Sequence, residues 1–127
     1  MGADVGFRTP LSMTQIAEAG EFMPAQFELD APLVFDSRHL SHAVEVPTRF
    51  RTDLASVPRL PLVWMIAGGI GNQASVVHDY LYRERPDVAR SVADAVFLEA
   101  LLDSGVSRWR AWAMYAAVRV FGHRKGA

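Results

Sequence analysis

The spacing of hydrophobic residues in the first fifty positions is that of short strands. QFELD alternates Phe27 and Leu29 with polar residues, LVF follows at 33–35, and HAVEV again has period two. Because successive side chains of a strand point to opposite faces, these runs predict a small antiparallel sheet or meander. Proline and glycine keep the strands short, and they stand at Pro10, Gly20, Pro24, Pro32 and Pro47.

The second half of the chain has helical spacing. Proline becomes scarce after Pro61, alanine becomes frequent, and hydrophobic residues recur every three to four positions. A short helix is predicted to begin at Ser56, with Pro58 in its first turn, where a missing N–H group costs nothing. Longer helices are predicted over about 72–83, 87–104 and 107–121, and the last two end at Gly105 and Gly122.

Strands followed by helices indicate an α+β fold, with a small N-terminal antiparallel β-sheet and a C-terminal bundle of three to four helices. The 127 residues suit one domain. We therefore expect a single domain over residues 1–127, strand-rich over about 1–50 and helical over about 56–122.

Composition narrows the classes of function. The chain has no cysteine, so it can form no disulfide or thiolate metal site, and a reducing cytoplasm suits it. Its start lacks a basic segment followed by an apolar run, and Pro61, Gly68 and Gly69 interrupt its longest apolar stretch, so neither a signal peptide nor a membrane span is predicted. The net charge of −1 implies no partner attracted purely by charge, and we do not favour nucleic acid.

The segment ASVVHDYLY carries the first candidate chemistry. On a helix, Ala74, His78, Leu81 and Tyr82 share one narrow arc, and Asp79 lies on its flank. Histidine titrates near neutrality, and a neighbouring carboxylate can bind a metal or orient a second group. The alternative is a core histidine that hydrogen-bonds a tyrosine.

Asp94 is the second candidate. Viewed around its predicted helix, Asp94 lies among Phe97, Leu98 and Leu101 on the apolar face. Glu99 and Asp103 are expected on the solvated face. A buried carboxylate needs a partner, because an unpaired buried charge is costly. The short connection makes the two helices antiparallel, so either His78 or Arg90 can reach Asp94.

Other polar residues are weaker candidates. Asp53 follows a predicted strand in FRTDLASVPR, so it is either a turn-capping residue or a site residue, whereas Thr52 and Ser56 favour a structural role. The loop AGGIGNQ is neither a P-loop nor a dinucleotide fingerprint. His39, His42 and His123 are expected to be solvated, with a His39/His42 metal pair as the less favoured alternative.

The last predicted helix is rich in aromatic residues. It carries Trp109, Trp112 and Tyr115, and one stripe of the helix consists of Arg108, Trp112, Tyr115 and Arg119. We expect these aromatic residues to belong to the core with a cation–π edge. A partner groove and an interfacial membrane face are the alternatives.

Four blocks together resemble a known family. VPTRFRTDLASVPR, ASVVHDYLY, ARSVADAVFLEAL and WRAWAMYAAVRVFG are similar, in content and order, to the phage and prophage family called domain of unknown function 1353, over roughly residues 43–122. The resemblance implies a phage or prophage origin, and hence a protein of the host cytoplasm during phage production or of the virion. Its partners would then be phage structural proteins or a small ester or lipid substrate.

The motif His-Asp-x-x-Tyr is similar to the active-site helix of secreted and viral phospholipases A2. This resemblance implies that His78 is the base that activates water, that Asp94 orients His78, and that Tyr82 supports them by hydrogen bonding. It also implies that Asp79 binds calcium, which would offset the oxyanion charge, and Asp53 is a second candidate metal ligand. This chain departs from the pattern because it lacks cysteines and a clear glycine-rich calcium loop, and because Asp94 follows His78 early.

Two main functions therefore compete. One is a His/Asp hydrolase, metal-assisted in its phospholipase-like form. The other is a virion or tail-assembly component in which His78, Asp79, Asp53 and Asp94 form a buried polar network. A host-interaction protein has the least support. Exposure of His78 to solvent distinguishes an enzyme from a sealed network.

Overall fold

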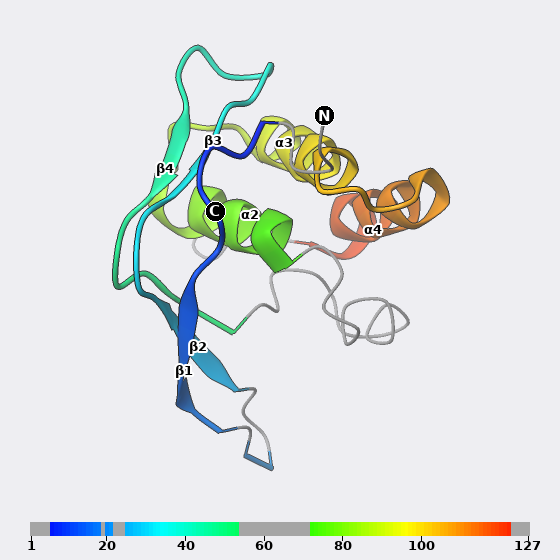
Figure 1. Ribbon diagram of the computed structural model, residues 1–127. Helices are drawn as coiled ribbons and strands as arrows, with labels where there is room; N and C mark the ends of the chain where they lie inside the picture. Colours follow the sequence, from blue (N-terminus) through cyan, green and yellow to red (C-terminus); the bar gives the residue numbers. More distant parts are fainter. Residues whose placement is uncertain (1–5, 19, 22–24, 54–71, 123–127) are drawn as a thin grey trace.

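The computed structural model describes residues 6–18, 20–21, 25–53 and 72–122. Strands come first and helices follow (Figure 1), which confirms the α+β prediction. The elements are β1 (Met13–Ala17), β2 (Gln26–Leu29), β3 (Leu33–Phe35), β4 (Val44–Val46), β5 (Arg51–Thr52), α2 (Asn72–Glu84), α3 (Arg90–Asp103) and α4 (Arg108–Phe121). The predicted helix start at Ser56, most of the glycine loop and His123 lie outside the described residues.

The described strands form two small antiparallel sheets. β1, β2 and β5 form one sheet in the order β1-β2-β5, and β3 and β4 form the other. The runs QFELD, LVF and HAVEV are strands, as predicted, but they do not form a simple meander, because β5 pairs with β2 across the β3–β4 hairpin. The β1 strand has no predicted counterpart, because most of its residues are exposed and give no hydrophobic alternation.

The β3–β4 hairpin contributes one wall of the core. Leu33 and Phe35 on β3 are fully buried, as are Val44 and Val46 on β4, whereas Glu45 between the valines is exposed. This hairpin packs on α2, α2 packs on α3, and α3 packs on α4. The period-two burial of the hairpin follows from the pleat of a strand, and it presents one apolar face to α2.

The helix ends follow their local sequence. The last turn of α3 is closed by the Ser104 N–H, which donates to the carbonyl oxygen of Ala100, and by the Val106 N–H, which donates to Leu101. Gly105 has a φ of 85°, a conformation that glycine adopts without steric cost. At its other end α3 begins at Arg90 and not at Asp87, because Asp87 binds Arg85 in the connection.

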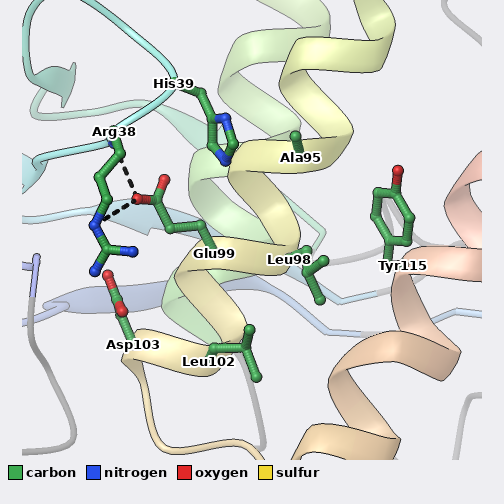
Figure 2. Close-up of a pocket in the computed structure, with 8 residues that line it drawn as sticks. All are labelled: Arg38, His39, Ala95, Leu98, Glu99, Leu102, Asp103 and Tyr115. Atoms are coloured by element: carbon green, nitrogen blue, oxygen red, sulfur yellow. Dashed lines mark hydrogen bonds and ion pairs between the residues drawn. The ribbon is translucent and has the colours of Figure 1, made fainter.

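Two predictions about exposure were wrong. Glu99 is 7% exposed and not solvated, because Ser37 and Arg38 hydrogen-bond to its carboxylate. Figure 2 shows Arg38 against Glu99. Trp109 and Trp112 are 61% and 50% exposed and are not core residues. Smaller side chains fill the inward face of α4 instead: Ala111, Met114, Ala117 and Val118.

The helices of the described residues are too short or too polar to cross a bilayer.

Candidate functional site

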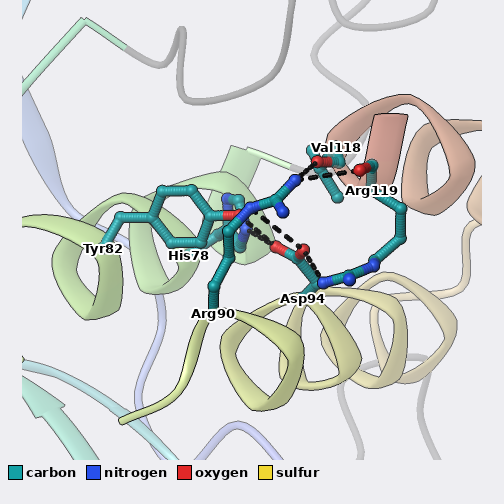
Figure 3. Close-up of polar contacts among 6 residues, drawn as sticks. All are labelled: His78, Tyr82, Arg90, Asp94, Val118 and Arg119. Carbon is teal, nitrogen blue, oxygen red and sulfur yellow. Dashed lines mark hydrogen bonds and ion pairs between the residues drawn. The ribbon is translucent and has the colours of Figure 1, made fainter. Parts of the chain in front are cut away.

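A buried hydrogen-bonded network joins α2 to α3. His78 Nε2 lies 2.7 Å from Oδ1 of Asp94. The Tyr82 hydroxyl donates to the same oxygen over 2.5 Å (Figure 3). His78 and Tyr82 are four residues apart on one helix, so both reach the facing turn of α3. The structure thus brings together the three residues expected to act in catalysis.

Two arginines complete the network. Arg119 Nη1 on α4 donates to Asp94 Oδ2 over 2.7 Å, whereas Arg90 Nε is 3.9 Å from that oxygen. Arg90 also donates to the Tyr82 hydroxyl over 3.1 Å and to the carbonyl oxygens of Val118 and Arg119 near the end of α4. Asp94 therefore has both predicted partners, His78 and Arg90. Its third partner, Arg119, was expected on the aromatic stripe of the last helix and not at this site.

The network fixes the protonation of its members. Burial raises the pKa of Asp94, but hydrogen bonds from His78, Tyr82 and Arg119 outweigh it and lower the pKa below its ordinary value. Burial lowers the pKa of His78, although Asp94 opposes this shift. The pair is therefore an ionised carboxylate and a neutral imidazole near neutral pH.

A neutral imidazole has one N–H group and one lone pair. A carboxylate can only accept hydrogen bonds, so the proton of His78 is on Nε2 and the lone pair is on Nδ1. Among the described residues, Nδ1 of His78 has no hydrogen-bond partner, although the atom is buried. A basic nitrogen is thus held in one orientation, with its lone pair unused by the rest of the network.

The ring of His78 is enclosed by other side chains. Its centroid lies 4.2 Å from that of Tyr82 and 4.6 Å from that of Phe97. The exposed fraction of both His78 and Asp94 is 0%, which by the exposure criterion favours a sealed polar network over an open active site. Burial together with the Asp94 contact raises the pKa of Tyr82 to about 12, so its hydroxyl stays protonated as a donor.

Asp79 belongs to a different cluster. Its Oδ2 accepts a hydrogen bond of 2.9 Å from Arg83, whose Nη1 also donates to the carbonyl oxygen of Arg51 over 2.7 Å. Burial raises the pKa of Asp79, while the Thr52 hydrogen bond and Arg83 oppose the shift and the charge of half-buried Asp53 adds to it. Asp79 and Asp53 thus lie close together where β5 meets α2, whereas His78 faces α3.

The residues described here are a poor match for calcium. Calcium takes about six to eight oxygen ligands, and Asp79 and Asp53 offer two carboxylates, one of which already binds the guanidinium of Arg83. Within the described ranges, no group of three or more histidine, aspartate or glutamate residues could hold a metal ion, the exposed His39 and His42 included. Calcium binding by Asp79 and Asp53, which the phospholipase resemblance implies, is untested, and the Arg83 contact of Asp79 argues against it.

A second polar cluster was not predicted. Glu99 accepts hydrogen bonds from the Ser37 hydroxyl over 2.6 Å and from the Arg38 N–H over 2.9 Å, and it borders an open pocket of about 250 Å³ (Figure 2). Burial and the charge of Glu99 raise the pKa of Asp103 in the same pocket. The helical periodicity gave no signal for this cluster, because Ser37 is 62 positions away from Glu99.

Comparison with known proteins identifies the family. The family described as protein of unknown function (DUF1353) matches residues 27–118. The chain belongs to the DUF1353 family. The match includes β2 to β5 and nearly all of the helical half, and with them His78, Asp94 and the candidate residues near β5.

A longer relative carries a similar segment. This DUF1353 chain is 35% identical, over 112 residues, to the uncharacterized protein y4jT of Sinorhizobium fredii (strain NBRC 101917 / NGR234). The aligned region covers 82% of this chain and 32% of the relative, so the chain spans about a third of that protein's length. No solved structure matches this chain.

Proposed function

We propose that this DUF1353 protein is a hydrolase of the His/Asp type in which His78 is the general base. One observation carries the proposal: Nε2 of His78 is fixed by Asp94, while the buried Nδ1 has no hydrogen-bond partner among the described residues. In a purely structural network an unsatisfied buried acceptor costs free energy and contributes nothing. A general base requires such a lone pair and also contact with water, so with His78 0% exposed the proposed reaction requires local opening of the packing around its ring.

The proposed reaction is hydrolysis of a small ester or a lipid ester. Nδ1 of His78 removes a proton from a water molecule, and the water oxygen forms a bond to the carbonyl carbon of the ester. When the tetrahedral intermediate collapses, the carbon–oxygen bond to the alcohol breaks, and His78 returns the proton to the departing alkoxide. Water supplies the hydroxyl group of the acid and the hydrogen of the alcohol, so the reaction needs no redox partner.

Asp94 and Tyr82 would act as positioning residues. Asp94 holds the Nε2 tautomer and stabilises the imidazolium that forms when His78 takes the proton. Tyr82 and Arg119 also donate hydrogen bonds to Asp94, so the carboxylate keeps its orientation. The similarity of this arrangement to the phospholipase A2 helix supports an ester substrate, and the family resemblance supports a phage or prophage setting.

Hydrolysis by purified protein tests the proposal. The substrates are p-nitrophenyl butyrate and vesicles of phosphatidylglycerol. The test variant is His78→Gln, and the matched control is His39→Gln at an exposed loop position. We expect kcat to fall at least about 100-fold in His78→Gln and to stay unchanged in His39→Gln, with both variants folded by circular dichroism. No turnover by the wild-type protein, or full activity of His78→Gln, would overturn the proposal.

The second candidate function is a non-enzymatic virion or tail-assembly component. The observation that favours it is the complete burial of His78 and Asp94, which suits a sealed network that fixes helix packing. In this case His78→Gln would lower the melting temperature, and the wild-type protein would hydrolyse no ester. The chain would then be detected by mass spectrometry in purified phage particles, and its absence from them would contradict this function.

A further inference from the structure

The outer face of α4 carries a stripe of exposed hydrophobic side chains. Trp109, Trp112 and Val120 are 61%, 50% and 71% exposed, and Ala116 between them is also exposed. These positions are three to four residues apart, so they follow one side of the helix over about 16 Å. We call these four residues the α4 stripe.

Packing of α4 does not require the stripe. The opposite face supplies the core contacts through Ala111, Met114 and Val118, all fully buried. Arg90 and Arg119 attach the second half of the helix to α3. The two tryptophans make ring contacts with Tyr115 and Arg110 but keep 61% and 50% of their surface exposed, and such exposed aromatic surface is typical of an interaction site.

The charge around the stripe is positive. Arg108 is exposed beside Trp109, and the guanidinium of Arg110 lies 5.5 Å from the centre of the Trp109 ring. Between Ser104 and Gly122 the sequence has no acidic residue, and of its three arginines Arg108 and Arg110 flank Trp109, whereas Arg119 pairs with Asp94. A partner of this surface is therefore expected to be anionic.

We propose that the α4 stripe binds the headgroup region of an anionic lipid bilayer, with α4 parallel to the membrane. Tryptophan prefers the boundary between water and hydrocarbon, and arginine binds lipid phosphates. Figure 1 shows α4 at the edge of the described elements, where its exposed side can lie against a flat surface. This contact is independent of the chemistry at His78, so either proposal can fail without the other.

Vesicle flotation tests the contact. The probes are vesicles of phosphatidylcholine alone and vesicles with phosphatidylglycerol, at low and high salt. We expect the protein to float with the anionic vesicles only, and less at high salt. Each of Arg108→Gln and Arg110→Gln should weaken binding about fivefold. Trp109→Gln combined with Trp112→Gln should abolish it.

The control variant is Ile16→Gln, because Ile16 is also exposed, at 41%, but lies on β1. It should bind like the wild-type protein. Equal binding by the double tryptophan variant, or no binding by the wild-type protein, would overturn the proposal. Light scattering provides a further test. A dimeric wild-type protein and a monomeric double tryptophan variant would also overturn the proposal, since the stripe would then be an interface between copies of this chain.

Discussion

Arg119 Nη1 on α4 lies 2.7 Å from Oδ2 of Asp94 on α3. This contact brings the last helix into a network whose other members come from α2 and α3. Together with the hydrogen bonds from His78 and Tyr82, it lowers the pKa of Asp94 and keeps the carboxylate ionised beside the neutral imidazole of His78. Asp94 is thus the point at which three helices are coupled, and its charge should control both stability and the state of His78.

Replacing Asp94 by asparagine should strongly destabilise the protein. The variant keeps the shape of the side chain but leaves Arg119 without its ion pair and His78 without a carboxylate. We expect the free energy of unfolding in urea to fall by about 3 kcal/mol. Asp87→Asn is the control, because Asp87 is exposed and its ion-pair partner is Arg85 in the same connection. An equal loss of unfolding free energy in both variants would contradict the central role of Asp94.

The stability of the protein should decrease as the pH falls below the ordinary histidine pKa of 6.5. Burial lowers the pKa of His78 in the folded state, so the unfolded chain binds the proton more readily in this range. The contribution of neutral His78 to the free energy of unfolding is therefore complete above pH 6.5. It declines as the pH falls from 6.5 to the lowered pKa of His78 in the folded state. Urea denaturation between pH 5 and 8 measures the slope.

The variant His78→Gln should show a smaller slope in the same pH range, and His39→Gln should keep the wild-type slope, since His39 is exposed. An unchanged slope in His78→Gln would show that another group titrates there. The effect of Asp94 is separate, because its lowered pKa places its loss of charge below pH 3.8.

One tyrosine should ionise unusually late. The chain has three tyrosines, and burial with the Asp94 contact raises the pKa of Tyr82 to about 12. Ultraviolet titration of the phenolate should show a component near this pH that is missing in Tyr82→Phe and present in Tyr115→Phe. Loss of the hydroxyl should also cost about 1 kcal/mol of stability. A late component that persists in Tyr82→Phe would refute the assignment.

Replacing Gly105 by alanine should cost about 1 kcal/mol of stability. The residue has a φ of 85°, which strains any side chain with a Cβ atom, and it ends α3. Gly20→Ala is the matched control, because a Cβ atom there would meet nothing within 4 Å. Thermal unfolding of both variants compares them directly, and equal melting temperatures would count against a strained helix end.

Calcium titration should distinguish a metal-free hydrolase from a metal-assisted, phospholipase-like one. Because Arg83 already binds Asp79, we expect calorimetry of metal-stripped protein to show no saturable calcium or zinc binding. Saturable calcium binding that disappears in Asp79→Asn would instead establish the metal-assisted form. His39→Gln is the control for adventitious binding by exposed histidines.

The sequence by itself determined the order of strands and helices, and it narrowed the partners of Asp94 to His78 or Arg90. Both follow from local patterns: helical periodicity placed each residue on the packed face, and the short connection between α2 and α3 made the helices antiparallel. The glycine that ends α3 was also readable, because its conformational preference is a local property.

Only the tertiary structure decided which distant residues complete these contacts. Arg119 reaches Asp94 across 25 positions, Ser37 buries Glu99 across 62, and β5 pairs with β2 across an intervening hairpin. Periodicity indicates that a helix has an apolar face, but α4 has apolar residues on two sides. Packing against α3 selected the side with smaller side chains and left Trp109 and Trp112 exposed, because the choice depends on the shape of the neighbouring helix, which no local pattern records.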